Sequence, residues 1–175
     1  QALRGLVDGS LACLGSSVKL HRAKIFDNIC FPEGLILEDN IAAHYILGAS
    51  NKIVTTDKML YFYVQRKGSI LADVNAVRFH ALHFKSNIIR WTDRYNYLMS
   101  LGMNDLAEIT FVKLYGVMVD AFKKTNYLQL RHEINKYLDQ TVIHLWRSRN
   151  LKNRLRIVKL FLVIFRSLFR PFVKE

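Results

Sequence analysis

Proline, glycine and cysteine are scarce in this sequence of 175 residues, which holds two prolines, eight glycines and two cysteines. Few helix breakers favour long helices. Cys13 and Cys30 are too few for a disulfide framework and lack a metal-binding spacing, so a reducing cytoplasm is the expected compartment. Residues 1–6 carry no secretory signal pattern and no initiator methionine, and we expect the chain to be part of a longer protein.

Carboxylates are also scarce, with 14 Asp and Glu against 26 Lys and Arg, which gives a formal net charge of +12. This excess favours anionic partners such as nucleic acid, phosphorylated ligands or an anionic membrane surface. We expect no nucleic acid, because the basic residues are not interleaved with exposed aromatics and no helix-turn-helix or zinc pattern occurs. The longest apolar run, Leu160–Phe165, is far shorter than the roughly 20 residues of a membrane span.

Hydrophobic periodicity predicts an α+β chain that is mostly helical. In the first part, strands are predicted by short runs rich in apolar and β-branched residues, and helices by apolar positions three and four apart. The predicted strands cover residues 11–18, 52–57 and 60–64, and the predicted helices residues 1–8, 19–26 and 39–50. We expect the strand over residues 60–64 to be buried on both faces.

The composition changes near residue 72, and long amphipathic segments follow. Glycine, asparagine and proline separate them, which predicts four helices in an antiparallel bundle. The predicted helices cover residues 73–100, 103–124, 127–146 and 150–169. The chain is therefore divided into an α/β piece over residues 1–71 and a helical module over residues 72–175.

Glu38 and Asp39 are two adjacent carboxylates that follow the turn at residues 32–34. One interpretation makes Asp39 or Asn40 the cap of the next helix, because a short polar side chain accepts hydrogen bonds from the first turn. The other makes the pair a catalytic site, because two close carboxylates repel each other and one of them can accept a proton near neutrality. Local pattern alone favours the cap.

A polar, basic loop follows the predicted strand over residues 60–64, and its sequence is Gln65-Arg66-Lys67-Gly68-Ser69. Its cations can neutralise a diphosphate, and glycine lets the backbone approach phosphate oxygens. The spacing is not that of a P-loop. An ordinary solvated turn explains the same residues equally well.

The last predicted helix is basic and amphipathic. Its cations and bulky apolar residues suit the surface of an anionic bilayer, and the same face can instead pack on the bundle or on another subunit. The residues that represent this surface are Arg154, Arg156, Lys159, Phe165, Arg166 and Phe169. The six histidines form no ligand-like set, so we expect no metal site within this chain.

The order of the motifs carries more information than any one of them. In sequence they are VKLHRAKIF (residues 18–26), ICFPEG (29–34), ED (38–39), KIV (52–54) and LYFYVQRKGSI (60–70). This string resembles the second half of the bacterial family 2 glycosyltransferases that build capsules, exopolysaccharides and glycoprotein glycans. The family pattern runs W-x-K-L-Y-R-R-x-L-F, F-P-E-G, E-D, K-I-V and Y-Y-Y-R-Q-R-x-G-S-I. The resemblance covers residues 18–70.

The resemblance implies a GT-A fold that transfers a sugar from a nucleotide-sugar donor to an acceptor hydroxyl, with inversion. It makes Asp39 the base that deprotonates the acceptor, with Glu38 as its neighbour. It places Gln65, Arg66 and Ser69 against the donor diphosphate. Lipid-linked or glycoprotein glycans are the implied acceptors. The helical module would hold the acceptor, mediate self-association or dock on the inner face of the plasma membrane.

The sequence departs from the family pattern at two positions, where Val18 replaces tryptophan and His21 replaces tyrosine. No D-x-D motif occurs in the chain. The ligands of the Mn²⁺ or Mg²⁺ that the resemblance implies are therefore expected outside this chain, and we expect the isolated chain to be inactive. The alternative function is a non-catalytic helical module for acceptor binding, oligomerisation or membrane docking.

Overall fold

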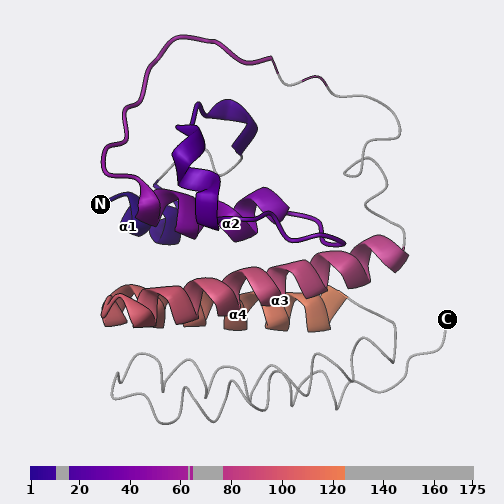
Figure 1. Ribbon diagram of the computed structural model, residues 1–175. Helices are drawn as coiled ribbons and strands as arrows, with labels where there is room; N and C mark the ends of the chain where they lie inside the picture. The colour runs from indigo at the N-terminus through magenta and orange to yellow at the C-terminus, as the bar shows by residue number, and fades with distance from the viewer. Residues whose placement is uncertain (11–15, 63, 65–76, 125–175) are drawn as a thin grey trace, which may run out of the picture. The chain divides into compact units, whose positions relative to one another are not determined.

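The computed structural model describes residues 1–10, 16–62, 64 and 77–124. These residues are mostly helical, as the sequence predicts (Figure 1). The elements are α1 (Ala2–Asp8), the 3₁₀ turns η1 (Ser16–Val18) and η2 (Ala23–Asn28), α2 (Glu38–Ala49), α3 (Val77–Ser100) and α4 (Asn104–Lys124). The chain divides into two compact units, residues 1–114 and 115–175. The predicted boundary after residue 71 falls outside the described residues, as do the predicted helices over residues 127–146 and 150–169.

The first unit is organised around α2, which packs against α1 and α3 and against both 3₁₀ turns. A cluster of Leu6, Ala43 and Leu47 joins α1 to α2. The next residue of α1, Val7, is fully buried. It belongs to a cluster with Leu98 of α3 and with Leu106 and Ala107 of α4. Adjacent positions on one short helix therefore enter two clusters. Burying one such side chain stabilises the fold by about 1.5–3 kcal/mol.

The turn between α3 and α4 confirms the stop that Leu101-Gly102 predicts. Gly102 has a φ of 70°, a left-handed conformation that glycine adopts without a Cβ clash. Its N–H donates to the carbonyl of Met99 over 3.0 Å, and the N–H of Met103 donates to that of Leu98 over 2.9 Å. This is a Schellman motif, and Met103 packs against Leu98, as the motif favours.

No described residue of the two predicted strands, 52–57 and 60–64, belongs to a strand. Every side chain from residue 51 to 62 is exposed. Leu60 exposes 76% of its accessible surface and Phe62 exposes 86%. The expectation of burial on both faces is therefore wrong for the described residues of this segment. Strands persist only when a neighbouring strand takes their backbone hydrogen bonds, and no described residue belongs to a strand.

Two other predictions in the first part need correction. Of the predicted strand over residues 11–18, the described end is the 3₁₀ turn η1, and residues 11–15 lie outside the described residues. The predicted helix over residues 19–26 is replaced by η2, because Arg22 is extended, with a ψ of 130°. Leu20 precedes this break and is fully exposed, so it shares no apolar face with Phe26. The ring of Phe26 instead stacks edge-on with His21, at 5.5 Å between centroids.

Candidate functional site

The start of α2 is shaped by an unusual backbone. Leu37 precedes the helix in a left-handed conformation with a φ of 62°, and no other described non-glycine residue has a positive φ. Such a conformation costs a non-glycine residue about 1–2 kcal/mol and is held by its surroundings. One holding contact is the N–H of Ile36, which donates to Oγ of Ser86 on α3 over 3.1 Å. The strained turn is thus fixed to the neighbouring helix.

The prediction that Asp39 or Asn40 is the N-cap is wrong by position, because Leu37 is the N-cap and makes no side-chain capping bond. The Asp39 carboxylate nevertheless serves the first turn. Its Oδ1 accepts from the N–H of Asn40 over 2.7 Å and from the Asn40 side-chain amide over 3.1 Å. A carboxylate in the first turn also interacts favourably with the positive end of the helix dipole.

Asp39 also links α2 to an earlier part of the chain. Its Oδ2 accepts from the N–H of Ser16 in η1 over 3.3 Å. Asp39 is half-buried, whereas its neighbour Glu38 is exposed. The structure thus separates the two predicted catalytic carboxylates by environment, with Asp39 held in place and Glu38 in solvent.

Arg94 of α3 holds the same turn of α2. Its Nη2 donates to the backbone carbonyl of Asn40 over 2.9 Å, and its side chain is 1% exposed. Burial, followed by the charge of Arg90, lowers the pKa of Arg94 to about 10, while Asp93 acts in the opposite direction. Arg94 therefore remains a buried cation at neutral pH. Asn40, whose carbonyl it binds, lies one turn of α2 before His44.

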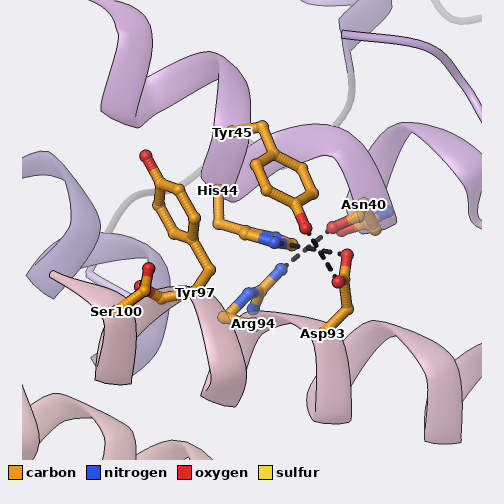
Figure 2. Close-up of polar contacts among 7 residues, drawn as sticks. All are labelled: Asn40, His44, Tyr45, Asp93, Arg94, Tyr97 and Ser100. Atoms are coloured by element: carbon orange, nitrogen blue, oxygen red, sulfur yellow. Dashed lines mark hydrogen bonds and ion pairs between the residues drawn. The ribbon is translucent and has the colours of Figure 1, made fainter.

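A partly buried polar cluster lies between α2 and α3, adjacent to Arg94 (Figure 2). The hydroxyl of Tyr45 donates to Oδ1 of Asp93 over 2.8 Å. Nε2 of His44 lies 3.4 Å from Oδ2 of the same carboxylate. The ring of Tyr97 completes the cluster, with its centroid 5.1 Å from that of His44 and 4.9 Å from that of Tyr45.

Two members of this cluster, His44 and Tyr45, are uncharged near neutral pH. His44 is fully buried, and burial, followed by the charge of Arg94, lowers its pKa to about 3. The close approach of His44 to Asp93 is therefore not an ion pair near neutrality. Burial, followed by the hydrogen bond to Asp93, raises the pKa of Tyr45 to about 12. The cluster thus holds α2 against α3 by hydrogen bonding and ring packing.

The other predicted site residues lie outside the described residues. These are Gln65, Arg66 and Ser69 for the donor diphosphate and Arg154, Arg156, Lys159, Phe165, Arg166 and Phe169 for the membrane or partner surface. In the described part of the chain, no three His, Cys, Asp or Glu side chains gather as a metal site would require. None of the helices that the structure describes is both long and apolar enough to cross a bilayer.

Sequence reasoning missed the contacts between α2 and α3. His44 and Asp93 are 49 positions apart in the sequence, and no local motif joins them. One signal was available, because the helical pattern puts Tyr45 on the apolar side of α2, where a phenol needs a hydrogen-bond partner. The partner itself follows only from the packing of two helices.

Comparison with protein-family models, with curated proteins and with solved structures finds no match to this chain.

Proposed function

We propose that this chain is the acceptor-side, C-terminal portion of a family 2 glycosyltransferase with a GT-A fold. The proposed reaction moves a sugar from a nucleotide-sugar donor to an acceptor hydroxyl with inversion. Asp39 accepts the hydroxyl proton as the oxygen bonds to the anomeric carbon, and the nucleoside diphosphate leaves. The negative charge that develops on the leaving group is stabilised by Gln65, Arg66 and Ser69.

The observation that carries this proposal is the environment of Asp39. Its carboxylate is oriented by the N–H groups of Asn40 and Ser16, yet it is only half-buried. A base must be both fixed and reachable by its substrate. Asp39 also occupies the E-D position in the ordered string of motifs that resembles the family. Glu38, in solvent, is the weaker candidate for the base.

The proposed compartment is the cytoplasm, with the last predicted helix on the inner face of the plasma membrane. The implied acceptors are lipid-linked or glycoprotein glycans, and a lipid-linked acceptor would itself lie at that surface. The net charge of +12 supports contact with anionic lipid headgroups.

A second candidate function is a non-catalytic module for acceptor binding, oligomerisation or membrane docking. It is favoured by the exposed apolar side chains of the segment from Ile53 to Val64, among them Met59 and Leu60. Contiguous exposed apolar groups mark interaction surfaces. Flotation with anionic liposomes, with and without residues 150–175, separates lipid binding from protein contact.

The catalytic proposal is tested with Asp39→Asn in the full-length gene product that contains this chain. The substitution keeps the shape and one acceptor oxygen but cannot take up a proton. We expect the rate of sugar transfer to fall by about 10²–10⁴-fold, which is the usual contribution of a general base. The assay measures release of nucleoside diphosphate from a panel of UDP- and GDP-hexoses and the mass gain of a glycan acceptor.

Asp57→Asn is the matched control, because Asp57 lies in the exposed segment after α2. This variant should transfer sugar at the wild-type rate. An Asp39→Asn enzyme as fast as wild type would remove Asp39 from the mechanism. A wild-type protein that transfers none of the panel sugars would favour the second candidate.

A further inference from the structure

Three cationic side chains surround one indole ring in the first unit. The Cζ atoms of Arg90 and Arg94 lie 4.7 Å and 4.9 Å from the ring centroid of Trp91, and Nζ of Lys113 lies 5.9 Å from it. Arg90, Trp91 and Arg94 come from α3, and Lys113 comes from α4. We call these four residues the Trp91 cluster. Cation–π attraction explains part of the arrangement.

The Trp91 cluster contains hydrogen-bond donors that have no acceptor among the residues the structure describes. Nε of Arg90, Nε of Arg94 and Nε1 of Trp91 are all buried, and none has a partner among the described residues. Leaving one buried donor unsatisfied costs about 1–3 kcal/mol, and more if the group is charged. Three such donors on the side chains of one cluster are the basis for inferring an acceptor there.

The charges of the cluster point to an anion. Burial lowers the pKa of both Arg90 and Arg94 to about 10, so both remain cations at neutral pH. The nearest carboxylate on α3, that of Asp93, has Oδ1 engaged by Tyr45 and Oδ2 facing His44. Asp8 of α1 interacts with the charge of Lys113, and that carboxylate is fully exposed.

We propose that the Trp91 cluster binds a small oxyanion of the phosphate class. Guanidinium, ammonium and indole N–H groups are donors only, and they match the acceptor oxygens of a phosphate group. Arg94 is buried, whereas Arg90 and Lys113 are half-buried, so these two cations form the partly exposed side of the site. The phosphate group can come from free inorganic phosphate or pyrophosphate or from a lipid headgroup. The proposal does not rest on the proposed sugar transfer, although Arg94 also holds the turn that carries Asp39.

The test follows the ring N–H of Trp91 by ¹H–¹⁵N NMR on the 175-residue chain. The sequence has two tryptophans, and Trp91→Phe assigns the Trp91 signal by removing it. We expect inorganic phosphate or pyrophosphate to shift this signal in a saturable way, because the indole N–H gains an acceptor. Vesicles of phosphatidylglycerol form the second arm. A shift with vesicles but not with the free anions identifies the lipid headgroup as the source.

Arg90→Gln removes one cation and its Nε donor, and it should weaken binding at least tenfold, since a hydrogen bond to a charged group contributes about 1.5–3 kcal/mol. Arg22→Gln removes the same charge from an exposed position and should leave binding unchanged. The proposal is overturned if neither phosphate, pyrophosphate nor vesicles shift the wild-type Trp91 signal. It is equally overturned if Arg22→Gln weakens binding as much as Arg90→Gln, because net charge would then be the cause. The wild-type titration decides the matter even if Arg90→Gln fails to fold.

Discussion

Gly48 on α2 is the position where one added methyl group tests the packing of α2 on α3 most directly. A Cβ at residue 48 would overlap the hydroxyl of Tyr97 and lie 2.9 Å from its Cζ and 3.2 Å from its Cε1. Tyr97 cannot move aside freely, because its ring packs against His44 and Tyr45. Gly48→Ala should therefore be destabilising, although alanine is the better helix former.

The expected size follows from two opposing terms. Alanine in place of glycine stabilises a helix interior by about 1 kcal/mol. Overpacking against a held side chain costs about 1–3 kcal/mol. The free energy of unfolding should therefore fall by about 1 kcal/mol in Gly48→Ala, as the difference between these terms. Gly116→Ala is the matched control, since no described atom beyond its own helix lies within 4 Å of a Cβ there. It should raise that free energy by about 1 kcal/mol.

Urea unfolding followed by circular dichroism measures both variants, and a second background identifies the cause. In Tyr97→Leu protein the clashing atoms are absent, so adding Gly48→Ala should become stabilising by about 1 kcal/mol. The interaction free energy between the two positions is then about 1–3 kcal/mol, the size of the overpacking cost. If Gly48→Ala stabilises the wild-type background as much as Gly116→Ala does, the packing of Tyr97 against Gly48 is not as described.

Two further perturbations test the turn and the buried histidine. Gly102→Ala should lower the free energy of unfolding, measured in urea, by about 1–2 kcal/mol, because alanine is strained at a positive φ. An unchanged free energy of unfolding would mean that the Schellman turn is not formed. His44 has its pKa lowered from 6.5 to about 3, so as the pH falls below about 6.5 the unfolded chain takes up a proton that the folded chain refuses. The wild-type free energy of unfolding should then fall, relative to His44→Gln, by about 1.4 kcal/mol per pH unit down to about pH 3; parallel pH profiles for the two proteins would contradict burial of a neutral His44.

The helices of the described residues were predictable because their signals are local. Apolar positions three and four apart mark α2, α3 and α4, and Leu101-Gly102 marks the stop between the last two. The bounds differ from the prediction by one residue at each end of α2 and at the start of α4. The described start of α3 is residue 77, because residues 73–76 lie outside the described residues.

The strands were not predictable from the same reasoning, because strand propensity measures fit to a sheet and not a preference of the isolated backbone. Residues 52–62 have the β-branched and aromatic composition of strands, yet they form no strand and their side chains are exposed. The left-handed Leu37 was equally hidden, since its conformation depends on the hydrogen bond between Ile36 and Ser86, 50 residues apart. Contacts across such separations follow from packing, and one sequence does not encode them as a pattern.

Two roles of Asp39, ordering the first turn of α2 and acting as a catalytic base, compete for the same lone pairs. A carboxylate offers about four acceptor positions, and three hydrogen bonds already reach Asp39, two at Oδ1 and one at Oδ2. An acceptor hydroxyl therefore has its best access at Oδ2, where only the 3.3 Å contact with Ser16 is made. Asp39→Ala removes every one of these bonds and should reduce both stability and transfer. Asp39→Asn keeps an acceptor oxygen for the first turn, so it should reduce transfer alone if Asp39 is the base, and neither property if Asp39 only orders the start of α2.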